Sequence, residues 1–113
     1  MPIQKVDVSK VQELHESSES VILLDVRERD EFRNESIAFA QNFPLSELDV
    51  GATLEALNID QDQATTPLYF ICRGGSRSES AAKKFHQSGY QHVYNVEGGM
   101  IKWLEQGLPT RKN

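Results

Sequence analysis

The 113-residue sequence is poor in cysteine and has no long apolar run. Cys72 is the only cysteine, which excludes an internal disulfide and fits a reducing compartment, where a thiol stays available for chemistry. No apolar stretch approaches the roughly 20 residues that a membrane helix needs. Residues 1–20 lack the basic-then-apolar order of a secretion signal. We therefore expect a soluble, cytoplasmic protein that does not act at a membrane.

Positive charge is also scarce. The chain has 17 acidic and 12 basic residues, a net charge of −5, and its basic residues are scattered, which argues against a nucleic-acid partner. His15, His86 and His92 lie in separate segments without metal-ligand spacing, and there is no second cysteine. We predict no bound metal and no cofactor.

Short apolar runs that alternate with amphipathic segments indicate an α/β fold. The predicted strands are residues 3–8, 21–26, 40–43, 68–71 and 93–96. The predicted helices are residues 9–17 or 9–18, 29–33, one or two within 45–57, 78–87 and 100–105. At this length the chain forms a single domain, with a mainly parallel central β-sheet of about five strands and helices on both faces.

Local signals add detail at both ends of the chain. Ser9 and Gln12 have the spacing of a capping box, which predicts that Ser9 caps the first helix. In the last helix, Ile101 and Leu104 are expected to face inward. Trp103, at helical spacing from Met100, is expected to lie in the core. Residues 109–113 are expected to form a frayed tail.

Cys72 stands where the strand at residues 68–71 gives way to Arg73-Gly74-Gly75-Ser76-Arg77-Ser78 and then to a helix. The two glycines let the backbone turn so that several N–H groups converge on one anion at the helix N-terminus. A free cysteine is only about 3% thiolate at neutral pH, and a downward pKa shift of roughly two units, about 2.7 kcal/mol, would make the thiolate dominant. The alternative is a buried structural cysteine, which the flanking arginines and glycines disfavour.

Three sequence motifs follow one another along the chain. The first comprises Leu24-Asp25-Val26-Arg27, Glu31-Phe32, Ile37, Ala40 and Asn42-Phe43-Pro44. The second is the cysteine loop, residues 72–78. The third comprises Gly89-Tyr90, Val93, Gly98-Gly99, Trp103 and Gly107-Leu108-Pro109. Together and in this order, the three motifs resemble those of the rhodanese family of sulfurtransferases, in which the second is the active-site loop. The resemblance implies a rhodanese-like domain at residues 1–108, followed by a tail at 109–113.

The resemblance implies that Cys72 takes sulfane sulfur from a small anionic donor such as thiosulfate and carries it as a persulfide. A thiol or cyanide, and among thiols a protein thiol, would then accept the sulfur. N–H groups of Gly74, Gly75, Ser76, Arg77 and Ser78 would stabilise the charged sulfur. Arg73 and Arg77 would attract the donor, the alternative being solvated side chains or a salt bridge to an acid such as Glu79. Asp25 and Arg27 would support the loop. The acidic cluster of Glu28, Asp30 and Glu31 is expected to be a solvated helix face or to contact a basic partner protein.

Two other functions compete with sulfur transfer. Domains resembling this one also serve as non-enzymatic regulatory or interaction modules, which need neither the cysteine nor the loop glycines. Related phosphatases have five residues between the cysteine and an arginine that binds phosphate. Here four residues separate Cys72 from Arg77, so the loop is one residue shorter than in those phosphatases.

Two departures from the family pattern concern the donor. Residues 35–40, Glu-Ser-Ile-Ala-Phe-Ala, replace the usual turn-forming residues at the mouth of the site. Gly74 stands where some thiosulfate-specific members have lysine, which argues against thiosulfate as the physiological donor.

Overall fold

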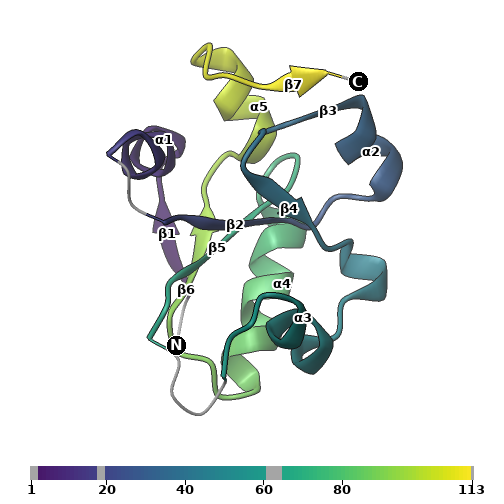
Figure 1. The fold of residues 1–113 in the computed structure, drawn as a ribbon. Helices are drawn as coiled ribbons and strands as arrows, with labels where there is room; N and C mark the ends of the chain where they lie inside the picture. The colour runs from purple at the N-terminus through teal and green to yellow at the C-terminus, as the bar shows by residue number, and fades with distance from the viewer. Residues whose placement is uncertain (1–2, 18–19, 61–64, 113) are drawn as a thin grey trace.

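A parallel five-stranded sheet organises the protein (Figure 1). The computed structural model describes residues 3–17, 20–60 and 65–112. The strands are β1 (Gln4–Val6), β2 (Ile22–Asp25), β4 (Ala40–Asn42), β5 (Leu68–Ile71) and β6 (Val93–Val96). They lie in the order β1-β6-β5-β2-β4, and every neighbouring pair is parallel. The predicted α/β fold with a parallel central sheet is confirmed.

Helices cover both faces of this sheet, as predicted. Helices α3 (Val50–Ala56) and α4 (Ser76–Gln87) lie on one side, and α1 (Val8–Glu16) and α5 (Gly99–Glu105) on the other (Figure 1). Each side has its own apolar core, with Phe70 and Phe85 in one and Val11 and Trp103 in the other. The helix α2 (Arg29–Asn34) and the 3₁₀ turn η1 (Leu45–Glu47) belong to the connections around β4. No helix in the described residues is long and apolar enough to span a bilayer.

Helix α4 follows the cysteine loop and begins two residues before the predicted start. Its apolar side chains Ala81, Ala82 and Phe85 are buried, in agreement with the helical spacing. Gly75 precedes the helix with φ +115°, a conformation that glycine adopts without steric cost. This turn lets the helix start at Ser76 instead of Ser78.

The predicted cap of α1 is wrong. The N-cap is Asp7, whose carboxylate accepts a hydrogen bond from the Ser9 N–H at 3.0 Å. The Gln12 side chain instead donates to Glu16 at 3.1 Å, one turn further along the helix. Serine and aspartate both serve as N-caps. Asp7 caps this helix instead of Ser9 because β1 ends at Val6, immediately before Asp7. The helix ends at Glu16, and Ser18, an alternative predicted end, lies outside the described residues.

In α5 the prediction that Trp103 lies in the core is confirmed, and the prediction that Ile101 and Leu104 face inward is wrong. Met100 and Trp103 are buried, whereas Ile101 and Leu104 are 42% and 46% exposed. Met100 and Trp103 are spaced three residues apart and so share one face of the helix. The larger Trp103 fills the core, and its indole N–H donates to the Pro109 carbonyl at 3.0 Å.

The C-terminal segment is ordered where the structure describes it. Arg111–Lys112 form β7, which pairs antiparallel with β3 (Glu35–Ser36). The Thr110 hydroxyl also donates to the Glu35 carboxylate. The expected fraying is therefore wrong for these residues, because β3 supplies hydrogen-bond partners. Asn113 lies outside the described residues.

Candidate active site

Cys72 lies at the carboxyl end of β5, in the middle of the sheet. The ladder extends to the preceding residue, since the Val26 N–H donates to the Ile71 carbonyl at 2.9 Å. The Cys72 side chain is only 1% exposed. In open parallel sheets the carboxyl ends of the strands are the usual place for ligands. The sequence prediction therefore placed Cys72 correctly at this edge.

Two hydrogen-bonding groups of the loop reach the sulfur. The Gly75 N–H lies 3.0 Å from Cys72 Sγ, and the Ser78 hydroxyl oxygen lies 3.2 Å from it. Helix α4 is 12 residues long and its N-cap, Gly75, has no capping side chain, so the positive end of the helix dipole is directed at the loop. Several loop N–H groups were expected at the sulfur; within the described residues, that of Gly75 is the one in hydrogen-bond range.

Asn95, on β6, holds both of these groups in place. Its side-chain NH₂ donates to the Gly75 carbonyl at 3.0 Å, which fixes the orientation of the amide. Its Oδ1 then accepts from the Ser78 hydroxyl at 2.6 Å. Ser78 has a single hydroxyl proton, so while it donates to Asn95 its oxygen is an acceptor for a protonated Cys72. If the sulfur is ionised, the same hydroxyl can turn and donate to it.

Asn95 was not among the site residues predicted from the sequence. The available signal was its position in the strand Val93–Val96, where an amide stands in an otherwise apolar and aromatic segment. A polar side chain buried in a strand requires hydrogen-bond partners. The sequence does not show that those partners are Gly75 and Ser78, because they lie 20 and 17 residues away.

The first turn of α5 supports the other side of the loop. The Met100 N–H donates to the Cys72 carbonyl at 2.9 Å, and the Ile101 N–H donates to the Arg73 carbonyl at 3.1 Å. Gly99 makes this close approach possible. A Cβ at Gly99, which has φ +54°, would lie 2.4 Å from the Cys72 carbonyl oxygen. The glycine pair 98–99 therefore serves close backbone packing as well as a turn.

Asp25 and Arg27 form a buried ion pair next to the loop. Arg27 Nη2 lies 2.8 Å from Asp25 Oδ2, and the Arg27 N–H also donates to Asp25 Oδ1 at 3.0 Å. The same Nη2 donates to the Glu35 carbonyl at 2.8 Å. The pair thus connects the end of β2 to β3, in the segment where the sequence departs from the family pattern. This geometry fits the supporting role expected for both residues.

The two loop arginines have different surroundings. Arg77 donates to both carboxylate oxygens of Glu31, at 2.7 and 3.0 Å, and this hydrogen-bonded pair lowers the pKa of Glu31 from its usual 4.5 to about 2. Glu31 is therefore not part of a solvated helix face, and the partner of Arg77 is not Glu79, which pairs with Lys83. Arg73 is exposed and makes no side-chain hydrogen bond or ion pair within the described residues.

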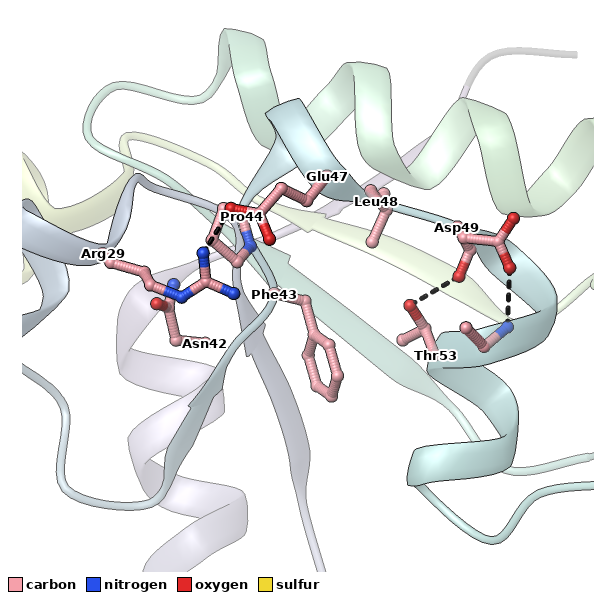
Figure 2. Close-up of a pocket in the computed structure, with 9 residues that line it drawn as sticks. Arg29, Asn42, Phe43, Pro44, Glu47, Leu48, Asp49 and Thr53 are labelled. Atoms are coloured by element: carbon pink, nitrogen blue, oxygen red, sulfur yellow. Dashed lines mark hydrogen bonds and ion pairs between the residues drawn. The ribbon is translucent and has the colours of Figure 1, made fainter.

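A separate pocket of about 260 Å³ lies on the β4 side of the sheet, and the cysteine loop does not line it. Figure 2 shows Arg29 pointing at Glu47 across its rim, with Phe43 and Leu48 in its wall. The Asn42 amide is already used, since it donates to the Asp25 and Arg27 carbonyls at 3.0 Å each. This pocket therefore adds no group to the candidate site. Among the described residues, no three His, Cys, Asp or Glu side chains are grouped to hold a metal ion.

Comparison with known proteins agrees with this geometry. The family model for the Rhodanese-like domain matches residues 7–106. A Bacillus subtilis protein named "Putative sulfurtransferase YtwF" is 33% identical over 109 residues, which is 96% of this chain and 98% of that protein. An uncharacterized protein from Synechocystis is 37% identical over 94 residues, 83% of this chain and 49% of its own length. The chain thus spans nearly all of one relative and about half of the other.

A solved structure shows the same fold. The rhodanese-like domain of an Anabaena protein superposes with a TM-score of 0.82 at 24% identity, and the match covers 96% of this chain and 79% of that one. At this identity the likeness shows the fold alone.

Proposed function

This chain belongs to the rhodanese-like domain family, and we propose that it is a sulfurtransferase which carries sulfane sulfur on Cys72. The observation that carries the proposal is the placement of Cys72 Sγ, 3.0 Å from the Gly75 N–H at the uncapped start of α4. This N–H group and the positive end of the α4 dipole can stabilise a sulfur anion, both before and after it gains a second sulfur. A relative of nearly the same length that is named as a sulfurtransferase supports it.

The reaction would be a double displacement through a covalent intermediate. The Cys72 thiolate attacks the outer sulfur of the donor, and the donor S–S bond breaks with its electron pair on the leaving group, which is sulfite when the donor is thiosulfate. An acceptor thiolate or cyanide then attacks the outer sulfur of the persulfide. The Cys72–sulfur bond breaks and the thiolate is regenerated, so no oxidant or reductant is consumed.

Arg73 and Arg77 would contribute unequally. Arg73 is exposed and unpaired within the described residues, so it is the arginine available to attract an anionic donor. Arg77 is held by Glu31 and therefore braces the loop. Because Cys72 is nearly covered, entry of the donor requires side chains around the loop to move. Gly74 and Gly75 make such movement inexpensive.

The same observations disfavour the two rival functions. A phosphatase needs an arginine free to grip phosphate, and Arg77 is occupied by a carboxylate. A binding module needs neither the buried cysteine nor the Asn95 network that holds Ser78 and Gly75.

Intact mass spectrometry tests the proposal. The protein is incubated with thiosulfate and, separately, with a polysulfide donor, and its mass is compared with that of Cys72→Ser treated in the same way. The expected result is a gain of one sulfur atom that is reversed by cyanide and absent from the variant. No gain with either donor would favour the interaction module, and Cys72-dependent hydrolysis of an aryl phosphate would favour the phosphatase.

A further inference from the structure

Helix α5 presents two large apolar side chains to solvent. Ile101 is 42% and Leu104 46% exposed, and they are the large apolar side chains that stand exposed in the described part of the chain. Residues three apart lie on the same side of a helix, so the two side chains form one continuous apolar surface. Such a surface next to a candidate active site marks a place for a partner.

This surface adjoins the cysteine loop directly. The Ile101 N–H donates to the Arg73 carbonyl at 3.1 Å. Ile101 Cδ1 lies 4.0 Å from the point where a Cβ of residue 74 would stand. Ile101, Leu104, Met100 and Arg73 line one hollow of about 300 Å³. We refer to Ile101, Leu104 and Arg73 as the α5 docking surface.

The exposed charge next to Ile101 is the cation Arg73. Of the acidic side chains in the wall of the hollow, Glu31 forms an ion pair with Arg77, whereas the Glu35 carboxylate accepts a hydrogen bond from the neutral Thr110 hydroxyl and keeps its charge. Arg27 in turn is neutralised by Asp25. Arg73 remains as an exposed cation without a partner in the described residues. A complementary partner would therefore bring a carboxylate as well as an apolar side chain.

We propose that the sulfur acceptor is a protein segment whose cysteine lies next to an apolar and an acidic residue, and that the segment docks on the α5 docking surface. This inference rests on the proposed sulfur transfer. Thiosulfate and cyanide have no apolar side chain to bury, so they make no use of Ile101 or Leu104. A peptide segment gains about 1.5–3 kcal/mol for each large apolar side chain that it buries fully.

The transfer step balances without a further reactant. The partner's thiolate attacks the outer sulfur of the Cys72 persulfide, and a new S–S bond forms on the partner. The bond between that sulfur and Cys72 breaks, and its electron pair returns to Cys72 as a thiolate. The partner leaves as a persulfide.

The test compares two synthetic peptides as acceptors for the persulfidated protein. One peptide has a single cysteine flanked by two leucines and an aspartate, and in the other both leucines are serines. Persulfide leaving the protein is followed by intact mass. We expect the leucine peptide to react about tenfold faster, which corresponds to about 1.4 kcal/mol. Equal rates for the two peptides would overturn the inference.

Variants of the protein test whether the preference for the leucine peptide arises at the α5 docking surface. Leu104→Asn, alone and together with Ile101→Asn, should reduce the peptide preference to about twofold or less, because both side chains are exposed and their contribution is to the partner. Leu14→Asn is the matched control, since Leu14 is a partly buried leucine on α1 that lines none of the hollows described above. It should retain the full preference. Loss of preference in the control as well would contradict docking on α5.

A second measurement separates this inference from the proposed function. The unloaded protein is reacted with both peptides as thiopyridyl disulfides, a reaction in which Cys72 forms a mixed disulfide and thiopyridone absorbance is recorded. A peptide preference that depends on Leu104 in this reaction supports docking even if no persulfide ever forms. If sedimentation shows that α5 instead joins two copies of the chain and that Leu104→Asn separates them, the docking surface is a dimer interface and the inference fails.

Discussion

Arg77 and Glu31 form an ion pair with two hydrogen bonds, Nη1 to Oε1 at 2.7 Å and Nη2 to Oε2 at 3.0 Å, although they are 46 residues apart in the chain. The pair ties α2 to the first turn of α4 and so to the cysteine loop. About a third of each side chain remains exposed, which limits the energy of the pair but leaves its geometry intact. Its effect is to hold the start of α4 against the segment that follows β2.

The first prediction concerns the pH dependence of this pair. The pKa of Glu31 is lowered from 4.5 to about 2 in the folded protein, chiefly by the hydrogen bonds from Arg77. The contribution of ionised Glu31 to the stability of the folded protein is therefore fully present above the unfolded pKa of Glu31. It is lost as the pH falls from about 4.5 to about 2. Glu31→Gln should lower the free energy of unfolding by about 1 kcal/mol at neutral pH. This difference, measured by urea unfolding, should shrink towards zero at the acidic end.

The comparison between wild type and Glu31→Gln removes other acidic titrations. Asp7 also has a pKa of about 2, because Lys102 donates to it, but it is present in both proteins and cancels. A difference that stays constant from neutral pH to about pH 2 would contradict the assignment to Glu31.

The second prediction concerns the buried pair of Asp25 and Arg27. Asp25→Asn leaves the buried Arg27 guanidinium without its carboxylate, and we expect a loss of about 3–5 kcal/mol in the free energy of unfolding. The double variant Asp25→Asn with Arg27→Met should be less destabilised than Asp25→Asn, since it leaves no unpaired charge. Urea unfolding of the four proteins in this cycle gives the coupling. If the double variant lost as much as the sum of the two single ones, the residues would act independently.

The third prediction separates close packing from backbone strain at glycine. Gly99→Ala places a Cβ 2.4 Å from the Cys72 carbonyl oxygen and should cost about 2–5 kcal/mol as well as impair persulfide formation. Gly107→Ala is the matched control, because Gly107 also has a positive φ, +68°, but has open space around it. It should cost only about 1 kcal/mol and spare the reaction. Similar losses in the two variants would mean that strain alone matters.

The fourth prediction concerns the positioning role of Asn95. Asn95→Ala removes the support of both the Gly75 carbonyl and the Ser78 hydroxyl, so persulfide formation should slow by at least about tenfold. Asn42→Ala is the matched control, because the Asn42 side chain also makes two hydrogen bonds, each 3.0 Å long, but to carbonyls at and just after the end of β2. Both variants should lose stability by about 1–3 kcal/mol in urea unfolding. Equal slowing in both would show that the effect is general destabilisation.

Much of the fold could be predicted because its signals are local. The apolar runs at β5 and β6 agree with the observed strands residue for residue, and the spacing of Ala81, Ala82 and Phe85 identified the buried face of α4. In α5 the spacing was right for Trp103 but wrong for Ile101 and Leu104. Met100 with Trp103 and Ile101 with Leu104 are two apolar pairs with equal spacing, and nothing within the helix itself decides which one faces the sheet.

The candidate site divides in the same way. The position of Cys72 could be predicted because the strand, the cysteine and the glycine turn follow one another in the sequence. The ion pair of Asp25 with Arg27 is similarly local, since the two residues are only two positions apart. The partners Glu31 for Arg77 and Asn95 for Ser78 join residues 46 and 17 positions apart. Which of several similar acids or amides becomes the partner depends on how the elements pack.

The amino-acid sequence by itself determined the strands, the alternation with helices and the cysteine loop, because hydrophobic periodicity and glycine turns act over a few neighbouring residues. The tertiary structure decided the pairing of Arg77, the support by Asn95, the order of the C-terminal segment and the exposure of Ile101 and Leu104. These features depend on contacts between distant segments, and such contacts are selected only when the whole core is packed.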